Sequence, residues 1–519
     1  MHDHRAGRSP SRRSIGRRPW SPDAARARRA GAAVRALVLA AALAAWPAPA
    51  PAAETAATAP PGGWFGLFAA ERFLAVGGAE AGHLAPAAGA WHFHDEWIAV
   101  PAPGRSGGRT PPPLVWLAAP ELIENARLDD GGRLLRRADG GAAALEVVPP
   151  LPANELYVDA STFEFFERRP VRIRGTWRST PEGERFVART IWPLDARIPW
   201  WTLEPRPVVE PESLADLVRA QAPDQPGARL LWERPRNVAR DWAGRAVLAV
   251  VLSGAQADAP GAQGGHIAIA TGRLGAAGEW SEWLVNNVYP IATFDEKGIS
   301  SGPVPMDNYL ADLNSGQAMY RPVYVLAAVL GAPAAAEEVQ AVFHDFFPRY
   351  WCREIEFDRA RNNSTEMSLD PLRGLGWRIP RMGGTSRIKG ALVAIAVAVA
   401  TLRPKLARDA WSYFTQERTD IFPRLAFEAV AGDLLALAAE EPPRPPTGFE
   451  ARLRTDVDGL LFLRFPQIPS RRPTGTYPVA SIREYRARVG LGNAAGADPD
   501  ERDPRPFPDR LHDACRAGR

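Results

Sequence analysis

The chain has 519 residues, of which 46% are hydrophobic, so it is long enough to bury one large core or two modest ones. Its 63 Lys and Arg residues nearly balance its 59 Asp and Glu residues, and the basic excess lies in positions 1–30, which argues against a nucleic-acid-binding protein. Its two cysteines, Cys352 and Cys515, are too few for a disulfide framework or a four-cysteine zinc site.

Residues 1–52 have the layout of an export signal, with a basic leader, an apolar run at 31–46 and a small-residue cleavage site that ends at Ala52. The apolar run is shorter than the roughly 20 residues of a membrane-spanning helix, so we expect cleavage and no membrane span in the mature chain. Residues 11–15, SRRSI, fit a twin-arginine box, and that route and the general secretory route both stay open. The predicted location is periplasmic or extracellular.

Residues 53–240 form a β-rich N-terminal region in which Gly and Pro separate short strands. The alternating segments 169–179 and 183–193, joined by Thr180-Pro181-Glu182, predict a hairpin. Leucines at helical spacing after a proline predict a helix at 211–221.

Residues 241–390 alternate apolar strands with helices. We expect strands at the segments 243–254, 265–274 and 281–290, followed by an apolar strand after Arg321. The amphipathic pattern of 333–351 and the capping residues at the start of 362–377 predict two helices.

Residues 391–490 are predicted to form a helical extension with a final strand at 458–465, and residues 491–519 a disordered polar tail. The run at 389–402 is apolar on all sides and only about 13 residues long, which predicts a buried helix rather than a membrane span.

His266 opens one of the predicted strands directly after Gly264-Gly265. A base that takes a proton from a nucleophile has to be held rigidly with a near-neutral pKa, and this placement offers that. A histidine satisfied within the core is the structural alternative.

Asn362-Asn363-Ser364-Thr365 opens a predicted helix about a hundred positions later. Unpaired backbone N–H groups and the positive end of the helix dipole favour an anionic nucleophile there and can receive an oxyanion. The same residues are also the preferred ones for a simple helix cap.

The order of these segments resembles a known family. A GGH strand, a strand with asparagines, a YRPVYVL segment, an acidic amphipathic helix and an Asn-Asn-x-Thr helix start are similar to the Lnb-type lipoprotein N-acyltransferase N-terminal periplasmic domain. That family is a circularly permuted relative of NlpC-type papain-fold peptidases and, more distantly, of lecithin retinol acyltransferase. The resemblance covers about residues 245–380.

The resemblance implies an α+β chain whose residues 241–390 form a permuted papain-like domain. In it His266 would be the base, and Asn286 or Asn287 would orient its ring. Ser364 takes the position of the family's cysteine nucleophile, or Asn363 does if the register slips by one. Asn362, Asn363, Thr365 and Arg321 would lie at the substrate.

A serine in place of the cysteine leaves two functional hypotheses open. A histidine can activate a serine, which gives an amide or ester hydrolase or acyltransferase acting on a cell-envelope peptide, lipoprotein or lipid. The alternative is a catalytically degenerate binding or structural module. Cys352 is a further candidate for the nucleophile, with a small buried residue as its structural alternative.

A third hypothesis is a metal-binding protein. His92 and His94 lie two apart, which puts both rings on one face of a strand, and Asp95 or Glu96 could add a carboxylate. The chain has no phosphate-binding loop or dinucleotide fingerprint, so no cofactor is expected.

Overall fold

The structure is a computed structural model, and it describes residues 63–77, 96–104, 109–148, 158–219, 226–235, 239–254, 264–290, 301–313, 321–383, 386–465 and short stretches between 467 and 487. Helices and strands are both abundant in these residues, which confirms the predicted α+β fold class. The export signal at 1–52, the pair His92 and His94, and the tail at 491–519 lie outside the described residues.

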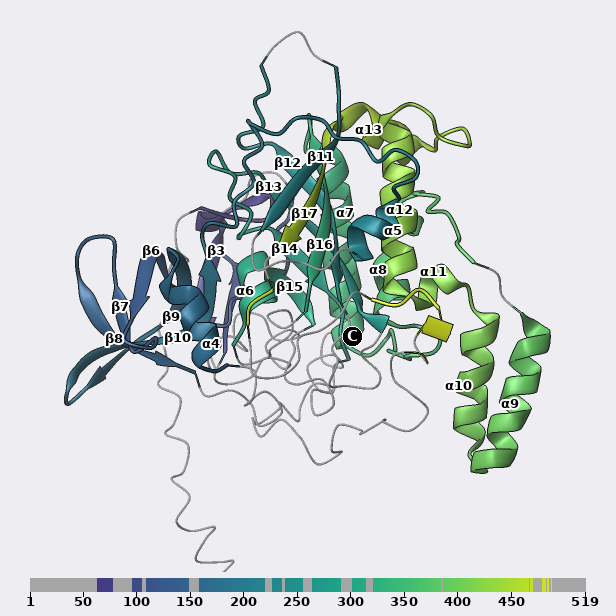
Figure 1. Cartoon of the computed structure of the whole chain (residues 1–519), viewed down its shortest axis with the longest axis horizontal. Coiled ribbons are helices and arrows are strands. Elements are labelled where there is room, and N and C mark those ends of the chain that lie inside the picture. The colour runs from purple at the N-terminus through teal and green to yellow at the C-terminus, as the bar shows by residue number, and fades with distance from the viewer. Residues whose placement is uncertain are drawn as a thin grey trace, which may run out of the picture. The chain divides into compact units, whose positions relative to one another are not determined.

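A seven-stranded sheet with the order β11-β17-β16-β12-β13-β14-β15 forms the centre of the described fold, and all its neighbouring strands are antiparallel (Figure 1). Its strands are β11 (Gly227–Glu233), β12 (Ala246–Ser253), β13 (His266–Arg273), β14 (Leu284–Asn287), β15 (Gly302–Pro305), β16 (Val323–Leu330) and β17 (Val457–Phe465). Strands β12 and β16 are buried along their whole length, which explains their continuous Val, Leu and Ala runs. The strands expected in this part of the sequence are therefore confirmed.

Helices cover one face of this sheet, which we call the helical face. Phe427 of α12 (Pro423–Ala438) packs on Phe462 of β17, with 6.4 Å between ring centroids. Gln340 of α7 (Ala334–Trp351) bonds to Asn286 on the same face. The helix α8 (Ser364–Gly374) packs against β13, α7 and α12 (Figure 1).

The opposite face, the barrel face, meets a closed barrel with the strand order β10-β8-β7-β6-β9. The barrel strands are β6 (Glu121–Asp129), β7 (Leu134–Arg136), β8 (Ala142–Val147), β9 (Val171–Thr180) and β10 (Gly183–Pro193). The antiparallel β9–β10 pair confirms the predicted hairpin. Trp192 of β10 packs on Phe465 of β17, and Asp307 of α6 (Met306–Ala311) accepts hydrogen bonds from Arg172 at 2.9 Å and Arg174 at 3.0 Å.

Smaller elements complete the described fold. They are β1 (Trp64–Phe65), β2 (Phe68–Ala69), η1 (Ala70–Arg72), β3 (Phe73–Gly77), β4 (Trp97–Pro101), β5 (Val115–Trp116), α4 (Ala160–Glu167), α5 (Leu214–Arg219), α11 (Arg418–Ile421) and α13 (Gly448–Asp456).

Strand β17 reaches the sheet from far along the chain. It lies between β11 and β16, and it pairs with both. The predicted domain boundaries after residues 240 and 390 therefore fall within one sheet, because β11 precedes the first boundary and β17 follows the second. The residues that the sequence suggested as a helical extension contribute an interior strand and the covering helix α12.

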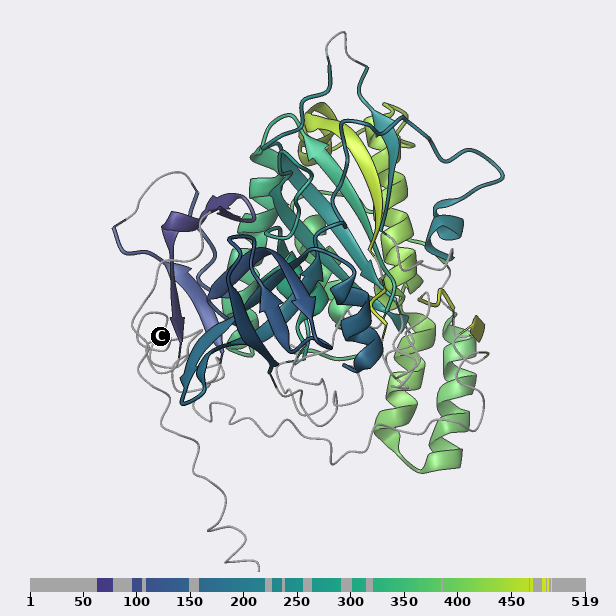
Figure 2. The same ribbon diagram turned by 60° about the vertical axis from the view of Figure 1, so that its left-hand side comes forward.

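Helices α9 (Arg387–Thr401) and α10 (Pro404–Thr415) form a hairpin that extends away from the sheet (Figure 1, Figure 2). The prediction of a buried helix at 389–402 is wrong, because large aliphatic side chains of α9 are 62% to 85% exposed. Helix α9 packs chiefly against α10, and side chains of α10 lie directly against Gly390 of α9. Within the described residues, no helix has the length and apolar character needed to cross a bilayer.

Candidate active site

The ends of three strands meet at one end of the central sheet because its strands are antiparallel. Strand β12 ends at Ser253, β13 begins at His266 opposite it, and β14 ends at Asn287. Gly265 turns the chain into β13 with a φ of +84°, and a Cβ at this position would lie 2.7 Å from the Ser253 carbonyl oxygen. The turn that presents His266 therefore depends on glycine.

The His266 ring is held between an amide and two tyrosines. Its Nε2 lies 2.9 Å from Oδ1 of Asn287, and its ring centroid lies 4.5 Å from that of Tyr289 and 6.5 Å from that of Tyr309. With a carbonyl oxygen as the acceptor, Nε2 carries the proton and Nδ1 is the basic nitrogen. Nδ1 makes no hydrogen bond to a described residue. It keeps some exposure, because it is not one of the fully buried polar atoms that lack a partner.

The protonation state of His266 follows from its surroundings. Burial and, to a smaller extent, the positive charge of Arg321 lower the pKa of His266 to about 3, while the Asn287 hydrogen bond acts in the opposite direction. The ring is therefore neutral at pH 7, but a pKa this far below neutral makes it a weaker base than the near-neutral histidine expected from the sequence.

Only one of the two asparagines predicted to orient the ring contacts it. Because successive side chains of a strand point to opposite faces, Asn287 lies on the His266 side and Asn286 on the other. Asn286 instead exchanges two hydrogen bonds with Gln340 of α7, at 3.0 and 3.1 Å, in a buried network that includes Thr271.

Arg321, predicted to contact substrate, is 2% exposed. Its guanidinium donates to the Gly254 carbonyl oxygen at 3.2 Å and to the Tyr289 hydroxyl at 3.1 Å. The hydroxyl of Tyr350 also donates to the Tyr289 carbonyl oxygen, at 2.5 Å. Arg321 therefore fixes the tyrosine that covers His266.

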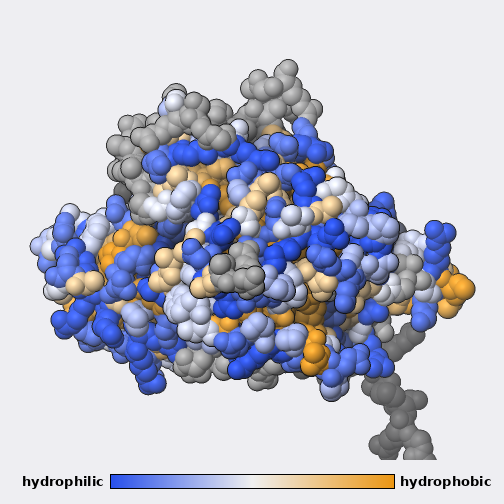
Figure 3. Space-filling model, turned by 90° about the horizontal axis from the view of Figure 1, so that it is seen from above, coloured by the Kyte–Doolittle hydropathy of each residue, from blue (hydrophilic) through white to orange (hydrophobic). Residues whose placement is uncertain are grey.

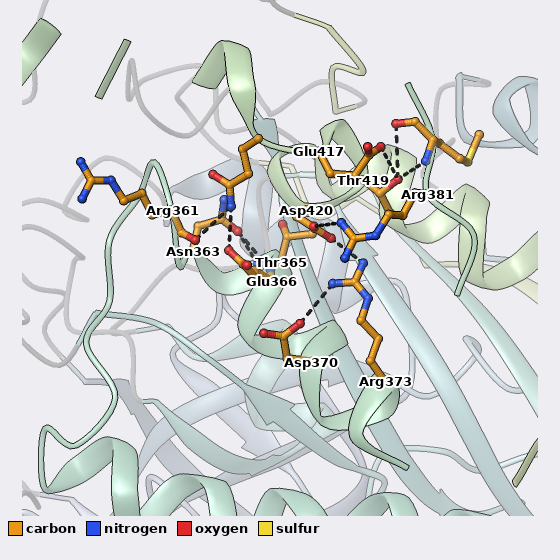
Figure 4. Close-up of polar contacts among 12 residues, drawn as sticks. Arg361, Asn363, Thr365, Glu366, Asp370, Arg373, Arg381, Glu417, Thr419 and Asp420 are labelled. Carbon is orange, nitrogen blue, oxygen red and sulfur yellow. Dashed lines mark hydrogen bonds and ion pairs between the residues drawn. The ribbon is translucent and has the colours of Figure 1, made fainter. Parts of the chain in front are cut away.

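The predicted nucleophile region is a capped helix start (Figure 4). The Asn363 side-chain oxygen accepts hydrogen bonds from the backbone N–H groups of Thr365 at 2.8 Å and Glu366 at 3.2 Å. Thr365 is 1% exposed, and the Asn362 amide donates to the Glu356 carbonyl oxygen at 2.7 Å. In the described structure, the backbone N–H of Ser364 has no hydrogen-bond acceptor, so it is the group left for an oxyanion.

Ser368 connects the helix start to the histidine strand. Its hydroxyl lies 2.7 Å from the Ser364 carbonyl oxygen and 3.4 Å from the Ile267 carbonyl oxygen. The residue after His266 and the predicted nucleophile are thus joined through one side chain.

Ser364 and His266 nevertheless make no hydrogen bond to each other in the described structure. The His266 side chain projects from the barrel face, as its cross-strand partner Ser253 does, whose hydroxyl lies 3.1 Å from that of Tyr309 in α6. Helix α8 packs with the helices of the opposite face. The two groups can therefore approach only around the end of the sheet.

A charged network beside the helix start was not predicted from the sequence (Figure 4). Arg373 pairs with Asp420 at 2.5 Å and with Asp370 at 3.1 Å, and Arg381 also pairs with Asp420. Burial, Asp370 and Asp420 raise the pKa of Glu366 to about 7, although Gln416 donates a hydrogen bond to it at 2.7 Å. Asp370 and Arg373 lie three positions apart in α8, but Asp420, Arg381 and Gln416 come from distant segments, so local sequence patterns carry no signal for most of the network.

The tyrosines and Ser253 around the ring were also not predicted. Tyr289 had a usable signal, because it follows Asn287 by two positions and strand alternation would put both on one side. Tyr309 and Ser253 had none, because α6 reaches the ring only through the tertiary fold.

The other predicted sites have different outcomes. Cys352 is disulfide-bonded, so it is not a free thiol nucleophile. His92, His94 and Asp95 lie outside the described residues, while Glu96 pairs with Arg189 at 2.8 Å. Within the described residues, no cluster of three or more His, Cys, Asp or Glu side chains could hold a metal ion.

Comparisons of the chain with protein-family models, curated proteins and solved structures found no match.

Proposed function

We propose that this chain is an exported cell-envelope hydrolase or acyltransferase that acts on an amide or ester bond of a peptide, lipoprotein or lipid. The observation that carries the proposal is the bond between Nε2 of His266 and Asn287, which leaves Nδ1 of a neutral ring as a base. The leader at 1–52 supports export, and the disulfide at Cys352 suits an oxidising compartment.

The proposed reaction begins when Nδ1 of His266 takes the proton of the Ser364 hydroxyl, whose oxygen attacks the carbonyl carbon of the substrate. Asn287 holds the ring, and the free N–H of Ser364 receives the oxyanion. The imidazolium then returns its proton to the leaving amine or alcohol, which leaves an acyl-serine for water or an acceptor amine to cleave. In the described structure the two side chains lie on opposite faces of the sheet, so this proton transfer requires them to come together around its end.

A specific observation favours a second candidate, a binding module without catalysis. Ser364 makes no hydrogen bond to His266 in the described structure, and a serine is a weaker nucleophile than the cysteine that the resemblance implies.

Fluorophosphonate labelling of the intact protein separates the two candidates. For the enzyme we expect a label on Ser364, loss of the label in Ser364→Ala, and a labelling rate that is about 10²–10⁴-fold lower in His266→Ala. Asn287→Ala should slow labelling, whereas Asn286→Ala, its matched control on the opposite face, should not. Equal labelling of all these variants would rule out the Ser-His pair.

Ser364→Cys tests the geometry without a substrate. If His266 can reach position 364, iodoacetamide will alkylate the new thiol faster in the presence of His266 than in the double variant with His266→Ala, because the base increases the thiolate fraction. Equal rates in the two backgrounds would favour the binding module.

A further inference from the structure

Helix α9 carries a stripe of large aliphatic side chains in solvent. Its members follow one another at intervals of four and three residues, which places them on one side of the helix. They are Ile388, Leu392, Ile395 and Val399 of α9 and its C-cap Leu402, each 62% to 85% exposed. Figure 3 shows an apolar patch at the edge of the molecule where this hairpin lies. Solvent-exposed apolar stripes of this size mark interaction sites.

The charges around the stripe are almost all positive. Arg387 and Lys389 stand about 100° to either side of it on the helix, one residue before and one after Ile388. Arg403, Lys405 and Arg408 lie at the other end of the hairpin, and Asp409 is the single acidic residue in 386–415. Within the described structure, none of these five cations takes part in a salt bridge.

We propose that the α9–α10 hairpin docks on the surface of an anionic phospholipid bilayer. The stripe would enter the boundary between headgroups and acyl chains, while the flanking cations reach the phosphates, as in helices that lie in the plane of a membrane. The stripe is about 21 Å long at the helical rise, too short to cross the bilayer core. The hairpin therefore lies on the membrane and does not span it.

Charge favours a bilayer over a second copy of the chain. A two-fold pairing of the stripes would place the cations at one end of a hairpin against those at the other end of its partner, and like charges in an interface oppose association. An anionic surface instead attracts both ends at once.

The hairpin is attached next to the candidate active site, although the proposal does not depend on catalysis. Tyr413 donates to the Arg359 carbonyl oxygen at 3.2 Å, Arg361 donates to Ser412 at 3.1 Å, and Gln416 bonds to Glu366. The base of the hairpin therefore contacts the loop before α8 and Glu366 within α8.

The test is flotation of the full chain with vesicles of phosphatidylcholine, with and without phosphatidylglycerol. We expect binding to the anionic vesicles that weakens as salt increases. Ile395→Glu with Val399→Glu should weaken binding by at least about ten-fold. Val209→Glu is the matched control, because Val209 is 62% exposed, as Ile395 is, and lies outside the hairpin.

A second pair of variants tests the charges. Lys389→Gln with Lys405→Gln should weaken binding to anionic vesicles, whereas Arg127→Gln with Arg178→Gln, two exposed cations of the barrel, should not. No binding by the wild type, or equal binding by stripe and control variants, overturns the proposal. The proposal is also overturned if the stripe variant binds vesicles as before but changes its oligomeric state, because a second copy of the chain would then be what covers the stripe. Phosphonate labelling of Ser364 is read out in solution, so its failure leaves this test unaffected.

Discussion

Helices α9 and α12 are similar in composition and opposite in environment. Both are rich in alanine and aliphatic residues, and α12 carries more charges, yet α12 is mostly buried and α9 is mostly exposed. The charges of α12 have partners, since Asp433 accepts hydrogen bonds from Trp377 and Arg444 and Arg424 pairs with Glu428. Burial in this protein therefore follows from specific packing and pairing, and apolar composition alone does not produce it.

The largest effect is expected in the core of α12. Phe427 is fully buried and packs on Phe462 of the sheet, so Phe427→Ala should lower the free energy of unfolding by about 3–5 kcal/mol. Denaturant titration followed by tryptophan fluorescence measures it. Phe427→Leu, which keeps most of the volume, should cost much less, and equal losses for the two variants would contradict a close-packed contact.

A smaller effect is expected where the hairpin joins the core, at Glu366. Its pKa is raised to about 7 in the folded protein, so the folded state binds the proton more tightly than the unfolded state does. The contribution of the protonated Glu366 carboxyl to the free energy of unfolding is fully present below its unfolded pKa, and it is lost as pH rises through about 7. Glu366→Gln should therefore stabilise the protein at about pH 8, by on the order of 1 kcal/mol after allowance for its half-exposed position.

Melting temperatures of wild type and Glu366→Gln across the pH range provide the measurement. The two curves should converge towards about pH 5, where Glu366 is protonated in the folded state. A difference that does not change with pH would show that the carboxyl group does not titrate in this window.

The smallest effect is expected on α9. Ile395→Ala removes a side chain that is 62% exposed, so the free energy of unfolding should change by no more than about 0.5 kcal/mol. The same titration as for Phe427 measures it. A loss comparable to that of Phe427→Ala would mean that another part of the protein covers the stripe in solution.

Much of the secondary structure could be predicted because its signals are local. The β9–β10 hairpin followed from alternation on both sides of a turn, and the start of α8 followed from Asn363 and its neighbours as capping residues. The environment of α9 could not be predicted, because hydrophobicity shows that a face is apolar and does not show what packs on it.

The site was predictable only in part for a related reason. Strand alternation shows that Asn286 and Asn287 point to opposite faces, and the tertiary fold is needed to decide which one shares a face with His266. Arg321 was assigned to the substrate from the family resemblance, and its burial against Tyr289 could not be predicted because it depends on a contact between distant segments. The relation between Ser364 and His266 depends on how α8 crosses the end of the sheet, which no local pattern encodes.

The position of β17 has a consequence for the synthesis of the protein. Strands β11 and β16 cannot close the sheet until β17, the last of its seven strands in chain order, has left the ribosome. Until then two apolar strand edges remain open, and such edges are templates for aggregation. Pairing between segments so far apart in sequence is also slow. The nascent chain should therefore depend on a holding chaperone for most of its translation, and a chain cut before residue 457 should be insoluble rather than merely inactive.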